Sequence, residues 1–222
     1  MAIKKVNFGA GKANQDYLKL YLGLQSRNML GGADNSRIIG FISRTGGEGV
    51  STTVSGLAMS LNSAFPGSVL VVDANPVTTG SKRIADIVEV NSRLLTTAAI
   101  QSGTPDIAEF IAGFGTTAVG LLTLDSDAAG QEIVATELCR VISDLKKEYA
   151  TILVDIGAWD QVIPTAWTAL LDHLVLVVDG NKTTRELLEN FKKTLEFSEH
   201  RLSGFILNRQ QRPIPEFLYR RL

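Results

Sequence analysis

Short apolar runs alternate with longer amphipathic segments along most of the chain. The short runs are rich in Val, Ile and Leu and end in polar residues: IIGFIS, SVLVVDA, AVGLLTLD, TILVDIG, HLVLVVDG and LSGFILN. The segments between them include STTVSGLAMSLNSA, GQEIVATELCRVISDLKKEY and TTRELLENFKKTLEFSE, which carry apolar residues at helical spacing. Strands separated by helices in this way predict an α/β fold with a mostly parallel β-sheet and helices on both of its faces.

A further helix is predicted before the first of these strands. Apolar residues at mostly helical spacing run through residues 14–30, and we place the end of this helix at Gly31 and Gly32. Residues 1–13 lack this periodicity and predict a loose arm. We therefore expect a single domain over residues 1–222, with an N-terminal arm and helix (1–36), an α/β core (37–210) and a C-terminal tail (211–222) that packs loosely or meets a partner.

Composition narrows the classes of function. The chain has 222 residues, 45% of them hydrophobic, which suits one sizeable core. Its net charge of −1 gives no overall attraction to nucleic acid, so we expect no nucleic-acid partner. The single cysteine, Cys139, excludes an internal disulfide, and no apolar run approaches the roughly 18 residues of a membrane span. These features predict a cytoplasmic protein.

The stretch from Arg37 to Thr53, RIIGFISRTGGEGVSTT, carries the first candidate chemistry. A strand runs into a glycine-rich turn and a helix start, as in the phosphate-binding pattern G-x-x-x-x-G-K-[ST], where backbone N–H groups and a lysine surround phosphates. Val50 stands at the lysine position and Ser51 at that of the magnesium-binding hydroxyl. The candidate nucleotide-binding residues are Gly46, Gly47, Glu48, Gly49, Val50, Ser51, Thr52 and Asn208.

Polar residues at other strand ends extend this candidate site. Asp73 and Asp155 each end an apolar run, and an aspartate facing a phosphate loop usually holds magnesium or its water shell. We therefore take Ser51, Asp73 and Asp155 as candidate metal ligands, and the two aspartates as catalytic if the protein is active. Asn208 is a candidate to read an adenine edge. Alternatively, the glycines form only a tight connection, and the aspartates and Asn208 serve turns; their joint occurrence at strand ends favours a site.

At these residues the chain resembles the bacterial tyrosine kinases of exopolysaccharide and capsule biosynthesis. That family is a branch of the deviant P-loop ATPases that include the Min and Par partition proteins. The similar segments are QDYLKLYLGLQ, RTGGEGVST, VLVVDAN, ILVDIGA, LDHLVLVVDGNKTTRELLENFKKTL and GFILNR, which cover nearly the whole chain. The resemblance implies a P-loop NTPase fold of the Min/Par type.

Departures from the family pattern affect its charged positions. Val50 replaces the phosphate lysine, Thr45 stands where partition ATPases have a second lysine, and Asn75 replaces the second acid of the D-x-D motif. The family's E-x-x-R-x-x-R pattern, implicated in ring assembly, falls on uncharged residues, and its tyrosine-rich tail is reduced to one tyrosine. The assembly pattern falls on Gln15, Leu18 and Tyr21, and the remaining tyrosine of the tail is Tyr219.

Together the matches and losses predict a degenerate member of that family. Our first hypothesis is a pseudokinase-like regulatory partner of a membrane polysaccharide co-polymerase (Wzz-like), with ATP or ADP and Mg²⁺ bound weakly or not at all. Such a protein is cytoplasmic, is held peripherally at the inner membrane through its partner, and is open to homo-oligomerisation. The alternative is an active autokinase, or a partition- or cellulose-synthesis-type ATPase, with a relocated cation; Arg44, Lys82 and Arg83 are the candidates.

Overall fold

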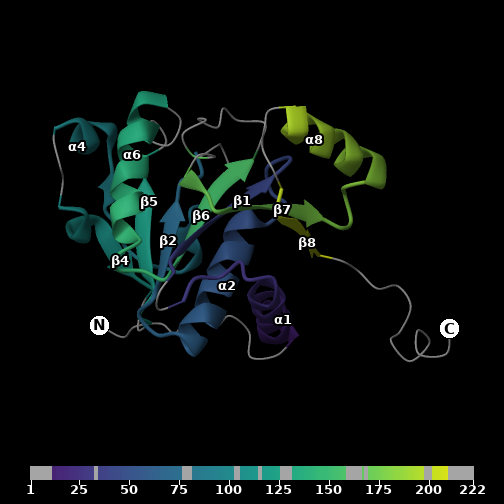
Figure 1. Ribbon diagram of the computed structural model, residues 1–222, viewed down its shortest axis with the longest axis horizontal. Helices are drawn as coiled ribbons and strands as arrows, with labels where there is room; N and C mark the ends of the chain where they lie inside the picture. The colour runs from purple at the N-terminus through teal and green to yellow at the C-terminus, as the bar shows by residue number, and fades with distance from the viewer. Residues whose placement is uncertain are drawn as a thin grey trace.

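The computed structural model describes residues 12–32, 35–76, 82–102, 106–114, 117–125, 132–158, 167, 170–197 and 202–209. In these parts of the chain, one eight-stranded sheet has the strand order β3-β5-β2-β6-β1-β7-β8, and β4 pairs antiparallel with β5 (Figure 1). All other pairings are parallel. The strands are β1 (Arg37–Ser43), β2 (Val69–Asp73), β3 (Leu94–Leu95), β4 (Ile111–Gly113), β5 (Gly120–Leu124), β6 (Thr151–Ala158), β7 (His173–Asp179) and β8 (Gly204–Asn208).

Helices lie on both faces of this sheet, as the sequence predicts. They are α1 (Lys12–Ser26), α2 (Val50–Ala64), α3 (Ile84–Ile87), α4 (Thr97–Gln101), α6 (Glu132–Leu145) and α8 (Arg185–Phe197), with a short 3₁₀ turn over Ile107–Phe110. Along β1, Ile38 and Ile42 join the core under α6 and α8, whereas Ile39 and Phe41 join the core under α1 and α2. The strand is apolar throughout because both of its faces are buried.

Helix α1 packs on α2 at one edge of the molecule (Figure 1). It begins at Lys12, two residues before the predicted start at residue 14, and ends at Ser26, so the predicted end at residues 31 and 32 is wrong. Asn28 takes a left-handed conformation (φ 55°), and the Met29 N–H donates to Leu24 O at 3.1 Å. Asparagine accepts this conformation readily, which closes the helix before the glycines.

Parallel pairing brings the predicted strand ends to one edge of the sheet. Asp73 lies opposite Asp155 in the β2–β6 pairing, and Asp179 lies opposite Asn208 in the β7–β8 pairing. The glycine-rich loop leaves the same end of β1. The sheet therefore gathers residues that are far apart in the sequence around the start of α2.

Some predictions concern residues that the structure does not describe. These are the first eleven residues of the arm, the tail of residues 211–222, and Tyr219. Within the described ranges, no helix combines the length and the apolar character needed to cross a membrane.

Candidate functional site

The glycine-rich loop connects the end of β1 to the start of α2. Gly47 (φ 81°) and Gly49 (φ 94°) both adopt left-handed backbone, which glycine accepts without a steric penalty. The Thr53 N–H is the first in α2 with an acceptor inside the helix turn, the Gly49 carbonyl at 2.9 Å. The N–H groups of Val50, Ser51 and Thr52 therefore have no intrahelical acceptor. Such a helix start suits an anion.

Val50 occupies the position of the missing lysine without replacing its chemistry. Its side chain is 5% exposed and belongs to the same buried cluster as Val54 and Val177. An apolar side chain in this position stabilises the start of α2 through packing. It offers no charge to a phosphate.

Glu48 ties the loop to the end of β7. Its carboxylate is buried and accepts hydrogen bonds from the Thr45 N–H at 3.1 Å, the Thr45 hydroxyl at 2.9 Å and the Asp179 N–H at 3.1 Å. The sequence grouped Glu48 with the nucleotide-binding residues. In the structure, its carboxylate is committed to holding the loop in shape.

Asn208, at the end of β8, also contacts the loop. Its side-chain amide donates to Glu48 O at 2.9 Å, and its Oδ1 accepts from the Arg209 N–H at 2.9 Å. A side chain on Gly49 would collide with the Asn208 amide, so glycine is needed at this close approach. The amide that was expected to face an adenine is thus bonded to the loop in this structure.

Arg209 is a site residue that the sequence reasoning missed. Its Nη1 donates to Gly47 O at 2.9 Å and to Asp179 Oδ2 at 3.0 Å. The side chain of Asn181 donates to Arg209 O at 2.8 Å, and the Asn181 N–H, together with Arg209, holds the pKa of Asp179 below its usual range. The only sequence signal was its place directly after Asn208 in GFILNR.

The two predicted aspartates lie side by side and are fully buried. Asp73 accepts hydrogen bonds from the Ile84 N–H at 2.9 Å and the Asn75 N–H at 3.3 Å. Asp155 Oδ1 accepts from the Gly157 N–H at 3.0 Å, whereas its Oδ2 is buried and has no hydrogen-bond partner among the described residues. Both carboxylates thus cap turns, as the alternative interpretation expected, but one oxygen of Asp155 has no such role.

Burial and proximity make this pair electrostatically strained. Burial, and then the charge of Asp73, raise the pKa of Asp155 to about 7, and the nearby Ser51 hydroxyl opposes part of this rise. Burial likewise raises the pKa of Asp73. Two such carboxylates are relieved by a shared proton or by a cation. The unpartnered oxygen and the Ser51 hydroxyl are hard oxygen donors of the kind that Mg²⁺ takes, together with water.

Among the described residues, no group of three or more His, Cys, Asp or Glu side chains is placed so that it could hold a metal ion. The site therefore offers two carboxylates and one hydroxyl, a set that leaves coordination positions for water and phosphate. Ser51, Asp73 and Asp155 are therefore side chains whose oxygen atoms are of the kind that Mg²⁺ takes.

The cations suggested from the sequence lie in different surroundings. Arg83 Nη1 donates to Leu124 O at 2.5 Å, and the charge of Arg83 acts on Asp73. Lys82 is exposed and Arg44 is half-buried, and neither makes a hydrogen bond or an ion pair with any described residue. Arg209, by contrast, donates a hydrogen bond to the loop.

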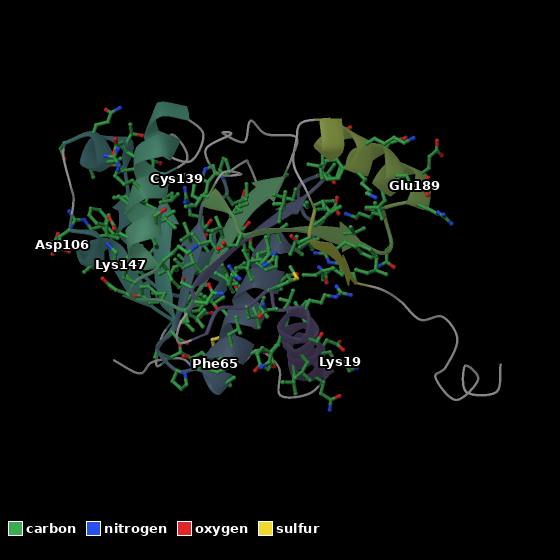
Figure 2. The ribbon with its side chains drawn as sticks, in the orientation of Figure 1. Lys19, Phe65, Asp106, Cys139, Lys147 and Glu189 are labelled. Carbon is green, nitrogen blue, oxygen red and sulfur yellow. The ribbon has the colours of Figure 1, made fainter. Side chains whose placement is uncertain are left out.

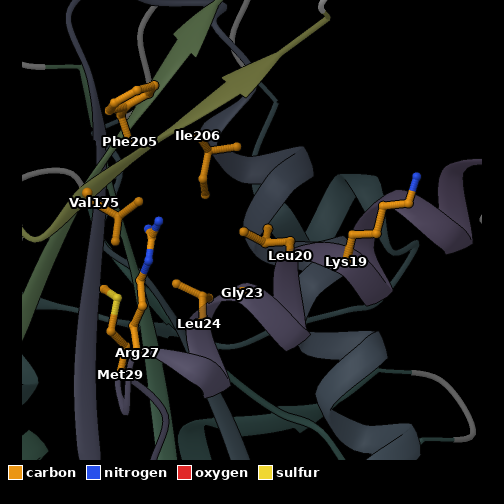
Figure 3. Close-up of a pocket in the computed structure, with 10 residues that line it drawn as sticks. Lys19, Leu20, Gly23, Leu24, Arg27, Met29, Val175, Phe205 and Ile206 are labelled. Atoms are coloured by element: carbon orange, nitrogen blue, oxygen red, sulfur yellow. The ribbon is translucent and has the colours of Figure 1, made fainter. Parts of the chain in front are cut away.

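A separate apolar groove lies between α1 and β8 (Figure 3). Its volume is about 170 Å³, and two basic side chains, Lys19 and Arg27, flank it. Lys19 pairs with Asp16 at 3.7 Å and points outward from α1 (Figure 2). The apolar lining residues are Leu20, Leu24, Met29, Val175, Phe205 and Ile206. None of these residues belongs to the loop or to the aspartate pair.

The sequence matches no protein-family model and no curated protein. Solved structures do share its fold. The VpsO kinase domain is 20% identical, with a TM-score of 0.71 over 90% of this chain and 95% of that one. The kinase domain of the Escherichia coli tyrosine kinase ETK is 16% identical, with a TM-score of 0.73 over 97% and 83%.

A cell division ATPase, MinD, has a similar fold. The septum site-determining protein MinD from Pyrococcus horikoshii, solved in complex with Mg-ADP, is 22% identical, with a TM-score of 0.60 over 84% of this chain and 76% of that one. At these identities the comparison establishes the fold. The chain therefore has the P-loop fold shared by bacterial tyrosine kinase domains and MinD-type ATPases, as its motifs predicted.

Proposed function

We propose that this protein is a regulatory, pseudokinase-like relative of the bacterial tyrosine kinases, which binds a magnesium nucleotide weakly and turns it over slowly or not at all. The observation that carries the proposal is the burial of Val50 at the lysine position, beside an aspartate pair that still fits a metal ion. On this proposal the loop and the aspartates still bind the nucleotide, while the charge that phosphoryl transfer needs is missing.

Nucleotide binding is supported by the loop and the strand ends. The free N–H groups at the start of α2 would hold phosphate oxygens. Ser51, Asp73 and Asp155 would hold Mg²⁺, which neutralises phosphate charge when bound. The orphaned Oδ2 of Asp155 would gain a partner in the process, so binding relieves a cost already present in the fold.

Slow turnover follows from the missing cation. A charge-assisted hydrogen bond contributes about 1.5 to 3 kcal/mol, so a buried valine weakens nucleotide binding roughly tenfold to a hundredfold. Phosphoryl transfer depends almost wholly on positioned charge, and one cation is worth on the order of a thousandfold in rate. Asn75 in place of a second acid removes a further charged group.

The resemblance to exopolysaccharide and capsule kinases supports a regulatory role that is exerted by binding a partner protein. On this proposal the partner is a membrane polysaccharide co-polymerase, which holds the protein at the inner membrane. In the first helix, the positions of the family's assembly pattern have changed character: Leu18 is 50% exposed, whereas Tyr21 is buried against Phe65. Assembly through charged residues at these positions is therefore not available to this chain.

A turnover assay tests the proposal. ATP hydrolysis and phosphorylation of Tyr219 are measured for the wild type, for Val50→Lys and for Asp155→Asn, with Mg-ADP binding recorded for each. We expect weak, Mg²⁺-dependent binding, and turnover that is absent or far slower in the wild type than in Val50→Lys. Wild-type turnover as fast as that of Val50→Lys and abolished by Asp155→Asn would show an active enzyme instead. Absence of Mg-ADP binding would overturn the proposed nucleotide site.

A further inference from the structure

The glycine-rich loop has no lysine at position 50, but an arginine from a distant part of the sequence, Arg209, donates a hydrogen bond to it. We propose that Arg209 is the phosphate-binding cation of this site, a role that rests on the proposed binding of nucleotide at the loop. Arg209 follows β8, and its guanidinium is bonded directly to Gly47 O in the middle of the loop. A cation therefore lies beside the loop, although not at the lysine position on which phosphoryl transfer depends.

The position of the guanidinium suits this role. A methyl group placed on Gly49 would lie 3.9 Å from Arg209 Nη2, so the cation stands beside the residue that precedes Val50. The N–H groups at the start of α2, which have no acceptor within the helix, follow directly. An anion held by those groups would have Arg209 within reach on the β8 side of the loop.

The guanidinium also keeps unused donors. Nη1 makes both of its bonds, to Gly47 O and Asp179 Oδ2, whereas Nη2 and Nε make none to the described residues. Arginine offers five N–H donors in a planar fork that matches phosphate oxygens. Three N–H donors, one on Nε and two on Nη2, are therefore available without breaking the existing bonds.

Arg209 is held in place before any ligand arrives. Its ionic partner, Asp179, has a side chain that is only 2% exposed and accepts a further bond from the Asn181 N–H at 2.9 Å. Asn181 and Asn208 fix the Arg209 backbone from two sides. A pre-ordered side chain loses little conformational freedom on binding, which favours affinity.

The neighbouring Asn208 raises an alternative, in which Arg209 contacts the base. Pyrophosphate and adenosine separate the two roles, because each carries only one part of the nucleotide. Each compound is tested in competition with a fluorescent ADP analogue for binding to the full chain, with Mg²⁺ present. The matched control is Arg27→Ala, since Arg27 is an exposed arginine in the α1–β8 groove with no side-chain hydrogen bond or ion pair to a described residue.

Arg209→Ala is expected to weaken ADP and pyrophosphate binding about tenfold or more and to leave adenosine unchanged. Val50→Lys added to Arg209→Ala is expected to restore pyrophosphate binding, because it returns a cation to the loop. Arg27→Ala is expected to bind all three ligands as the wild type does.

Unfolding midpoints show whether the loss of the Asp179 partner disturbs the fold. If Arg209→Ala proves unstable, Arg209→Gln keeps an amide donor without the charge and is expected to lose pyrophosphate binding as well. Unchanged pyrophosphate binding in a folded variant, or equal losses for adenosine and ADP, would overturn the role of Arg209 and leave the proposed function intact. A wild type that binds none of the ligands would overturn the proposed function itself.

Discussion

Individual side chains decide what this site can do. Val50 and Asp155 lie close to the same helix start but have opposite properties. Val50 is an apolar side chain at a position where a charged one is expected, and Asp155 is an ionisable side chain that is completely buried. The sequence identified both residues. It could not show that one oxygen of Asp155 lacks a partner, because that depends on which backbone N–H groups the turns bring to it.

The pKa of Asp155 predicts a pH dependence of stability in metal-free protein. Folding raises this pKa from 3.8 to about 7, so the native state binds more protons than the unfolded state between those values. The free energy of unfolding therefore falls as pH rises through this window. Asp155→Asn is expected to be more stable than the wild type at pH 8, with the advantage shrinking toward pH 4.

Denaturant unfolding in a chelator at several pH values measures this difference. A matched Asp144→Asn variant changes an exposed carboxylate and is expected to show no such gain at pH 8. A constant difference between Asp155→Asn and the wild type at all pH values would contradict the assignment of the strain to this carboxylate.

Magnesium is expected to stabilise the same site. An ion that binds only the native state raises the unfolding midpoint with its concentration. We expect millimolar Mg²⁺ to raise the midpoint of the wild type and not that of Asp155→Asn, measured by thermal unfolding at pH 8. Equal shifts of the unfolding midpoint in both proteins would show that Mg²⁺ does not act through Asp155.

At the scale of elements, periodicity predicted the long strands and helices but not their exact ends or the short pieces. Several elements are too short to show a hydrophobic periodicity. They are the two-residue β3, the three-residue β4 and the short helices α3 and α4. The end of α1 depended on Asn28 in a left-handed conformation, and the glycines that follow gave the stronger signal in the sequence. Arg209 was missed because its partners come from the loop and from β7.

The contact between α1 and α2 depends on one glycine. The Tyr17 ring covers Gly56, where an added methyl group would meet ring carbons at 2.3 to 2.5 Å. Gly56→Ala is therefore expected to destabilise the protein by about 1 to 3 kcal/mol, although alanine normally favours a helix. Gly23→Ala, at an open position of α1, is expected to stabilise it by up to about 1 kcal/mol. Chemical denaturation of both variants measures the contrast, and a stabilised Gly56→Ala would contradict this packing.

At the scale of the whole molecule, the sheet order creates the site. The loop after β1, the aspartates of β2 and β6, and the ends of β7 and β8 meet only because β1 lies between β6 and β7. The sequence predicted a parallel sheet and hence a common edge for the strand ends. It did not give the strand order, which determines that Arg209 approaches the loop while Arg83 lies toward β5.

We propose that the fold retains a magnesium-nucleotide site that lacks its lysine. Calorimetric titration of the wild type and Val50→Lys with Mg-ADP tests it most directly. We expect the wild type to bind, and Val50→Lys to bind roughly tenfold to a hundredfold more tightly, since the added ammonium makes a charge-assisted bond to phosphate. Equal affinities, or no binding by either protein, would contradict the account.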